Sequence, residues 1–169
     1  MEKIKVLLAD DHPAFREGLS RLLSEQDDLI IVGEAADGEE AVKLANELKP
    51  DVAVVDIAMP KLNGIEATKR IKEVCPNTAV LIVSAYDDEP YVINAIEAGA
   101  SGYLLKSIRV RELSAAIRAV HRDEMIFDSS AARKVFDSMT VSKDKPSTDE
   151  PSSPLKQREF EVLKLAAKG

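Results

Sequence analysis

Five short apolar segments recur along the chain, and each is followed by a turn signal and then by apolar residues at helical spacing. Their apolar content is nearly continuous, which is typical of strands covered on both faces of a parallel sheet. Because strand and helix alternate five times, the sequence predicts an α/β fold with a doubly wound, five-stranded parallel sheet. The expected strands are Ile4–Ala9, Leu29–Glu34, Val52–Asp56, Ala79–Val83 and Gly102–Leu105.

The segments between these strands carry the start and stop signals of helices. Pro13 suits the first turn of the helix after the first strand, and Pro50 closes the second helix. The third helix is expected over Ile65–Val74, while Asp88 and Gly99 are expected to cap and to end the fourth. A fifth apolar stripe at helical spacing follows the last strand.

After His121 the alternation of strand and helix stops, so a first domain is expected over residues 1–121. Residues 122–139 carry one more amphipathic pattern and are predicted to form an extra helix. Residues 140–154 contain four Ser, two Thr, three Pro and only one apolar side chain, which predicts a linker. Helical spacing then returns over residues 155–169.

Composition limits the class and the location of the protein. The longest apolar run, Ala79–Val83, has five residues and is far too short to cross a membrane. The N-terminal segment lacks the features of a signal peptide. Cys75 is the only cysteine, so neither an internal disulfide nor a cysteine metal cluster is expected. We therefore expect a soluble, cytoplasmic protein that does not contact membranes.

Polar side chains stand at the carboxyl ends of four predicted strands. Asp10 and Asp11 follow the first strand, Asp56 ends the third, Ser84 follows the fourth and Lys106 follows the fifth. In open parallel sheets ligands bind at this edge, and in the strand order 2-1-3-4-5 the first and third strands are neighbours. Three carboxylates then converge, which is costly unless a cation neutralises them. Hard oxygen ligands of this kind suit Mg²⁺.

The same residues predict a phosphoryl-accepting site. A carboxylate beside a metal ion can act as the nucleophile, so Asp56 is the predicted acceptor and would form an acyl phosphate. Lys106 and the metal ion would stabilise the charged equatorial oxygens, while Ser84 would donate a hydrogen bond to one of them.

Four motifs resemble those of the receiver domain of bacterial response regulators, over residues 1–121. They are Val6-Leu7-Leu8-Ala9-Asp10-Asp11-His12, Asp56-Ile57-Ala58-Met59-Pro60 followed by Asn63-Gly64, Val83-Ser84-Ala85 and Gly102-Tyr103-Leu104-Leu105-Lys106. The resemblance implies a flavodoxin-like fold and a sensor histidine kinase as partner, from whose histidine Asp56 accepts the phosphoryl group. It also implies a phosphorylation-dependent homodimer.

The resemblance assigns roles to individual residues. Asp11 and Asp56 would bind Mg²⁺ directly, Ala58 through its backbone carbonyl and Asp10 through water. Ser84 and Tyr103 match the switch pair of the family. On phosphorylation the Ser84 hydroxyl would be drawn inward, and Tyr103 would rotate into the vacated space.

Residues 155–169, from Leu155 through Arg158-Glu159 and Val162-Leu163 to Gly169, resemble the opening helix of a LuxR-type helix-turn-helix domain. This pairing is similar to that of the NarL/FixJ-type transcriptional regulators. A recognition helix does not occur before Gly169, so no DNA-binding residue is expected within this chain. DNA would be reached only through the remainder of the domain.

The sequence departs from the common receiver pattern at three positions. Ser107 stands where many relatives have a proline, and a trans peptide is expected there because a cis bond without proline is costly. Ala58 has no polar side chain to assist an attacking water, and Tyr86 is large enough to shield the phosphoryl group. Both residues favour slow dephosphorylation.

Other readings of the fold fit the residues less well. A flavodoxin-like cofactor carrier would need a phosphate cradle where Asp10 and Asp11 stand. A phosphatase of the haloacid dehalogenase type would place its nucleophile after the first strand, and a P-loop NTPase would need a Walker motif that the sequence lacks. The serious alternative is a receiver that only binds proteins. We expect a phosphoryl-accepting signalling domain and not a conventional enzyme.

Overall fold

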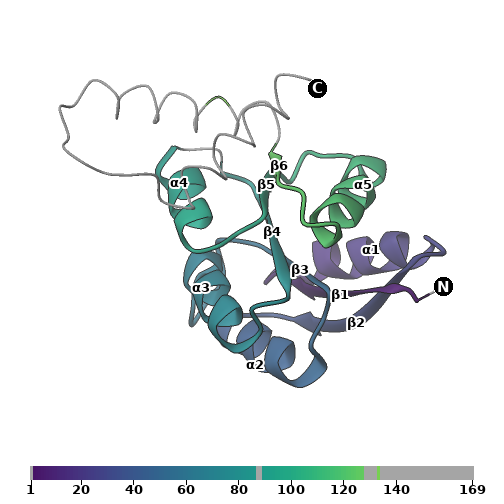
Figure 1. Ribbon diagram of the computed structural model, residues 1–169, viewed down its shortest axis with the longest axis horizontal. Coiled ribbons are helices and arrows are strands. Elements are labelled where there is room, and N and C mark those ends of the chain that lie inside the picture. Colours follow the sequence, from purple (N-terminus) through teal and green to yellow (C-terminus); the bar gives the residue numbers. More distant parts are fainter. Residues whose placement is uncertain (1, 87–88, 128–132, 134–169) are drawn as a thin grey trace.

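The computed structural model describes residues 2–86, 89–127 and 133, and it contains one sheet with helices on both faces (Figure 1). The strand order is β2-β1-β3-β4-β5-β6, and all neighbouring strands are parallel. The strands are β1 (Ile4–Ala9), β2 (Leu29–Ala35), β3 (Val52–Val55), β4 (Ala79–Ser84), β5 (Gly102–Leu105) and β6 (Ile126–Phe127). The helices are α1 (Pro13–Ser24), α2 (Gly38–Leu48), α3 (Gly64–Val74), α4 (Glu89–Glu97) and α5 (Val110–His121).

The predicted fold class and the order of the first five strands are confirmed. The short strand β6 was not predicted, and it lies in the range 122–139 that the sequence assigned to an extra helix. Ile126 donates its backbone N–H to Ser101 O at 3.0 Å, which extends the sheet beyond β5. A strand of two residues is too short to show an apolar pattern, so β6 could not be predicted from the sequence. Residues 128–132 and 134–139 of that range, the predicted linker and the final helix lie outside the described residues, as does the cap at Asp88.

The core consists of two layers, one on each face of the sheet. Leu7 and Ala9 of β1 belong to the cluster beneath α2, α3 and α4, whereas Val6 and Leu8 belong to the cluster beneath α1 and α5. This alternation follows from the opposite directions of successive side chains in a strand. Both faces of the sheet are therefore covered by helices, which explains the nearly continuous apolar strands in the sequence.

Gly64 brings the start of α3 against the end of β3. Its backbone N–H donates to Ile57 O at 2.8 Å, and a Cβ atom at this position would lie 2.1 Å from Asp56 O. Asn63 caps α3 by accepting a hydrogen bond from Glu66 N at 2.9 Å. The loop after Asp56 is thus held at a spacing that only glycine permits.

Candidate functional site

Two buried carboxylates lie side by side at the carboxyl edge of the sheet. Ala9 and Val55 are paired across β1 and β3, so Asp10 and Asp56 follow neighbouring strand ends. Asp56 also donates its backbone N–H to Ala9 O at 3.0 Å. Asp10 is 5% exposed and Asp56 is 3% exposed. Two charges held this close in a buried position need a compensating cation.

Lys106 supplies that compensation from the end of β5. Its Nζ lies 2.9 Å from Asp10 Oδ2 and 3.1 Å from Asp56 Oδ2. Lys106 is placed by its backbone N–H, which donates to Ser84 O at 2.8 Å. The structure therefore brings together three of the predicted site residues, from three different strands.

Burial and charge shift the pKa values within this group. Burial raises the pKa of Asp56, and the charge of Asp10 adds to the effect, while the hydrogen bond from Lys106 opposes it. For Lys106, burial acts to lower the pKa, but the hydrogen bonds to Asp10 and Asp56 outweigh it and raise the pKa. Lys106 thus stays protonated, and the raised pKa of Asp56 means that ionising this carboxyl carries a cost in stability.

The donor set fits a divalent metal ion. Ligand atoms of Asp10, Asp11, His12 and Asp56 all lie within 4.8 Å of one another. Asp11 Oδ1 is buried and accepts no hydrogen bond from the described part of the chain, although His12 Nδ1 lies within ion-pair distance at 3.2 Å. An orphaned carboxylate oxygen beside two further carboxylates suits a hard cation. Ala58 lies in the loop after Asp56, and its backbone N–H bonds to the Asp56 carboxylate.

Ser84 and Tyr103 meet at the loop that follows β4. Ser84 is fully buried, and its Oγ accepts a hydrogen bond from Tyr86 N at 3.0 Å. Tyr103 is also fully buried, and its hydroxyl donates to Tyr86 O. The two predicted switch residues are therefore joined through the backbone of Tyr86. That link could not be predicted, because it depends on the path of the loop.

Phe15 is a site residue that the sequence did not reveal. In the sequence it is only one of the apolar residues at helical spacing that follow the first strand. In the structure the centroid of its ring lies 4.7 Å from Lys106 Nζ. The only available signal was its position, three residues after His12, which places it in the first turn of the helix that starts at the site.

The peptide bond before Ser107 is trans, as expected, because there is no cis peptide among the residues that the structure describes. Cys75 is buried at the end of α3, and its thiol donates to Ala45 O at 3.1 Å. No helix in the described part of the chain is long and apolar enough to span a membrane.

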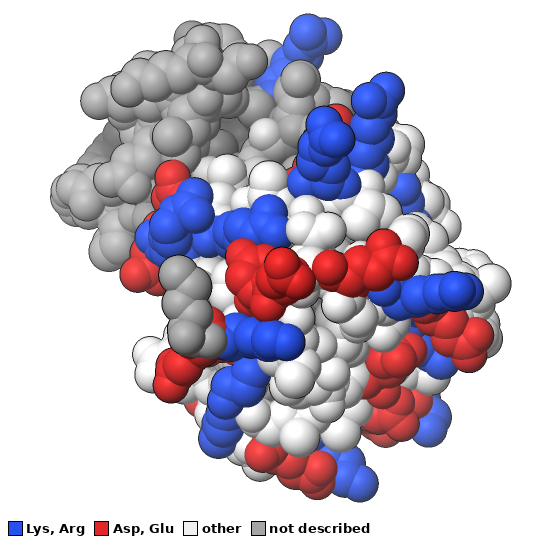
Figure 2. All heavy atoms as spheres, turned by 90° about the vertical axis from the view of Figure 1, so that its right-hand side faces the viewer, with Lys and Arg blue, Asp and Glu red and all other residues white. Residues whose placement is uncertain are grey.

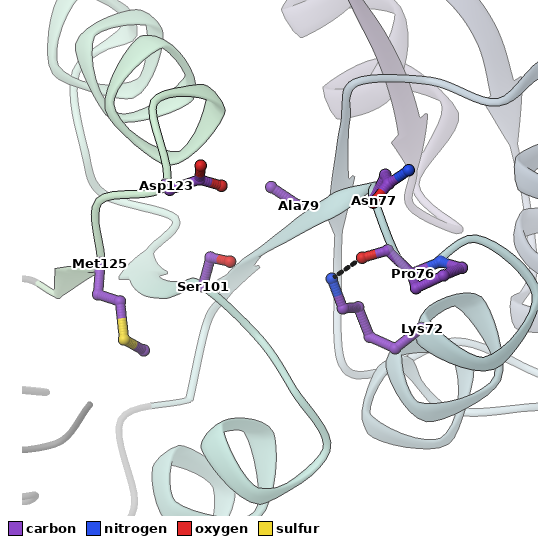
Figure 3. Close-up of a pocket in the computed structure, with 7 residues that line it drawn as sticks. All are labelled: Lys72, Pro76, Asn77, Ala79, Ser101, Asp123 and Met125. Atoms are coloured by element: carbon purple, nitrogen blue, oxygen red, sulfur yellow. Dashed lines mark hydrogen bonds between the residues drawn. The ribbon is translucent and has the colours of Figure 1, made fainter. Parts of the chain in front are cut away.

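A separate hollow of about 330 Å³ lies at the opposite end of the strands (Figure 3). Lys72 lies at its edge and donates to Pro76 O at 2.9 Å and to Thr78 O at 2.8 Å. These bonds close the turn between α3 and β4, so the ammonium group has a structural role there. Asn77 is exposed, as is Asp123, and none of the described residues that line the hollow belongs to the carboxylate site.

A metal-free protein with Asp56→Asn is expected to be more stable than wild type near neutral pH. A raised pKa means that folding favours the protonated carboxyl, so the stability that Asp56 contributes is present at low pH. It is lost as the pH rises above the ordinary value of 3.8. Urea unfolding with a chelator at several pH values measures the effect. The gain should shrink towards acidic pH, and an equal gain at every pH would contradict this account.

Comparisons with known proteins agree with this geometry. A family model described as "Response regulator receiver domain" matches residues 6–118. The transcriptional regulatory protein YxjL of Bacillus subtilis is 43% identical over 168 residues, which cover 99% of this chain and 77% of YxjL. The transcriptional regulatory protein LiaR of the same organism is 40% identical over 166 residues, covering 98% of this chain and 77% of LiaR.

Solved structures give the same result. A LuxR-family two-component response regulator from Aurantimonas superposes with a TM-score of 0.77 at 34% identity, covering 82% of this chain and 99% of that one. The receiver domain of a NarL response regulator from Mycobacterium tuberculosis superposes with a TM-score of 0.70 at 38% identity, covering 72% of this chain and 98% of that one.

Proposed function

The chain belongs to the response regulator receiver family, and from this premise we propose that it is a phosphorylation-controlled regulator of transcription whose phosphoryl acceptor is Asp56. One observation carries the proposal: the buried Asp56 carboxylate lies 3.1 Å from the Lys106 ammonium and within a cluster of further acidic ligand atoms. This arrangement combines a nucleophile, a fixed positive charge and a site for a metal ion. Phosphoryl transfer needs these three components.

The chemistry follows from the positions of these groups. An oxygen of Asp56 forms a bond to the phosphorus of a phosphohistidine on a sensor kinase, and the phosphorus–nitrogen bond breaks with its electron pair returning to the imidazole. Lys106 Nζ lies beside Asp56 Oδ2, where negative charge on the transferred group develops.

Asp11, Asp56 and the Ala58 carbonyl would hold Mg²⁺ directly, and Asp10 would hold it through water. When bound, Mg²⁺ supplies the positive charge that lets an anionic phosphoryl group approach three carboxylates.

The response would pass through Ser84 and Tyr103. A phosphoryl oxygen on Asp56 would accept a hydrogen bond from the Ser84 hydroxyl and draw it inward. The backbone of Tyr86, whose N–H donates to Ser84 Oγ, would move with it. Because Tyr103 donates to Tyr86 O, this movement changes the packing of the Tyr103 ring and the surface around Tyr86. Tyr86 is 45% exposed and its ring packs against Tyr91, so the change reaches the surface.

The change at the surface would act through binding to a second copy of the protein and to DNA. We propose that the changed surface forms a homodimer and that the protein acts in the cytoplasm. DNA would be bound only through a LuxR-type domain that begins at residues 155–169. Figure 2 shows that, among the described residues, the side of the molecule near α1 and α5 mixes acidic and basic side chains, so this part of the chain offers no uniformly positive face to a phosphate backbone.

A phosphorylation assay tests the proposal. The protein is incubated with Mg²⁺ and a small phosphodonor such as acetyl phosphate, and intact mass is measured. We expect one phosphoryl group on wild type and on Asp123→Asn, and none on Asp56→Asn or after chelation of Mg²⁺. Asp123 is a matched control because it is exposed, far from the site, and has a positive φ of 65° that asparagine also tolerates.

Two results would contradict the proposal. Equal phosphate on wild type and on Asp56→Asn would remove Asp56 as the acceptor. No phosphate on any form would favour a receiver that only binds proteins. Light scattering on the same samples reports the dimer, which is expected in phosphorylated wild type and phosphorylated Asp123→Asn and not in Asp56→Asn or in the samples without Mg²⁺.

A further inference from the structure

Phe15 stands at the boundary between the carboxylate site and an apolar groove. Its ring lines the small space beside Asp10 and Asp56, and it also lines a groove of about 260 Å³ between α1 and α5. Lys106 lines the same groove, and the end of its side chain reaches Asp10 and Asp56. The ring thus lies against the ammonium group at the edge of an apolar groove.

The first turn of α1 holds this ring in place. Arg16 Nη1 donates to Asp10 O at 2.7 Å, and Arg16 Nε donates to Glu34 Oε1 at 3.2 Å. The backbone N–H of Arg16 also donates to His12 O at 2.9 Å. The residue before Arg16 is therefore attached to the site through the backbone of Asp10, and the position of its ring is set by the same turn.

The ammonium group of Lys106 contacts two carboxylates and the Phe15 ring. An ammonium group has three N–H donors, and Asp10 Oδ2 and Asp56 Oδ2 lie at 2.9 and 3.1 Å from Nζ. The ring centroid lies 4.7 Å from Nζ, which is within the range of a cation–π interaction. The long lysine side chain loses considerable rotamer freedom when it is held in one position.

We propose that Phe15 is a positioning residue for Lys106, in which the face of the aromatic ring attracts the ammonium group and holds it over Asp56; this inference rests on the function proposed above. The ring attracts the cation without accepting one of its hydrogen bonds. When a phosphoryl group is present on Asp56, Lys106 can redirect a donor to a phosphoryl oxygen and keep its contact with the ring. A carboxylate at position 15 would instead compete for that donor.

The test separates attraction from packing by changing the electron density of the ring. Four proteins are compared with wild type: Phe15→Tyr, Phe15→Leu, pentafluorophenylalanine in place of Phe15, and the control Leu22→Ala. Leu22 lines the same groove, but it is 43% exposed and lies further along α1 than Phe15. The rate of phosphate uptake from acetyl phosphate is measured on the full chain at saturating Mg²⁺, and circular dichroism checks the fold.

We expect Phe15→Tyr and Leu22→Ala to react at the wild-type rate. Phe15→Leu and the pentafluoro protein, whose ring has a reversed quadrupole, should react about three- to tenfold more slowly. The affinity for Mg²⁺ should be unchanged in all five proteins, because Phe15 acts on Lys106 and not on the metal ligands. A pentafluoro protein as fast as wild type, or a Mg²⁺ affinity that falls together with the rate, would overturn the proposal.

A second measurement keeps this inference separate from the proposed function. The ring current of Phe15 should shift the Hε protons of Lys106 upfield in NMR spectra of wild type and of Phe15→Tyr, and the shift should vanish in Phe15→Leu. If wild type takes up no phosphate, the proposed function fails while this shift still tests the contact. If the shift is absent from wild type, Phe15 does not hold Lys106.

Discussion

Replacing Lys106 with methionine is expected to slow phosphate uptake on Asp56 about a hundredfold, because one fixed charge on the transferred group is worth that much in a buried site. Lys106 Nζ is 3.1 Å from Asp56 Oδ2 and its side chain is only 18% exposed, so water cannot readily replace it. Methionine keeps the length and the apolar stem of the side chain. The rate with a small phosphodonor at saturating Mg²⁺ measures the effect.

Lys106→Arg is the matched variant that keeps the charge. A planar guanidinium cannot take the place of a compact ammonium between two carboxylate oxygens, so its rate should fall between those of wild type and Lys106→Met. Lys106→Met should also be less stable than wild type without metal, since Asp10 and Asp56 lose their cation. A rate for Lys106→Met within twofold of wild type would show that Lys106 takes no part in the transfer.

Gly64→Ala is expected to lower the free energy of unfolding by about 3 kcal/mol, near the upper end of the usual cost of overpacking. The new Cβ would lie 2.1 Å from Asp56 O and 2.8 Å from Ile57 Cα, and backbone atoms cannot rotate away as a side chain can. Relief requires the loop after β3 to move, which also displaces Asp56. Urea denaturation measures the first effect, and the phosphorylation rate of the remaining folded protein measures the second.

Gly18→Ala provides the control for this prediction. Gly18 lies within α1, and a Cβ atom there would meet nothing within 4 Å. In such a position alanine should stabilise the helix by about 0.5–1 kcal/mol. A lower free energy of unfolding for Gly64→Ala and a higher one for Gly18→Ala would confirm that the close backbone contact at Gly64, and not the loss of a glycine as such, causes the effect. A loss at Gly64 no larger than a few tenths of a kcal/mol would contradict this interpretation.

Much of the fold could be predicted because each element carries its own local signal. β1 and β5 have the predicted bounds, and α3 begins at Gly64, one residue before the predicted start at Ile65. The acid cluster could be predicted as well, since the carboxyl ends of parallel strands share one edge of the sheet. Asp10, Asp56 and Lys106 lie together there, as expected.

The remaining features depend on contacts between distant segments and leave no pattern in the sequence. β6 has two residues, and it is a strand only through its pairing with the edge of β5. The contact of Phe15 with Lys106 joins α1 to the end of β5, 91 positions apart in the numbering. The link from Tyr103 to the carbonyl of Tyr86 depends on the path of one loop. Spacing rules describe single elements and cannot identify such pairs.

The most direct test of the central claim is the chemical identity of the phosphorylated residue. An acyl phosphate is reduced by borohydride to an alcohol, so phosphorylated Asp56 should be converted to homoserine. Wild type is phosphorylated with acetyl phosphate and Mg²⁺, reduced, digested and sequenced by mass spectrometry. We predict homoserine at position 56 alone, and none in a sample without the phosphodonor. Homoserine at Asp10 or Asp11, or phosphate retained on a hydroxyl such as that of Ser84, would contradict the account.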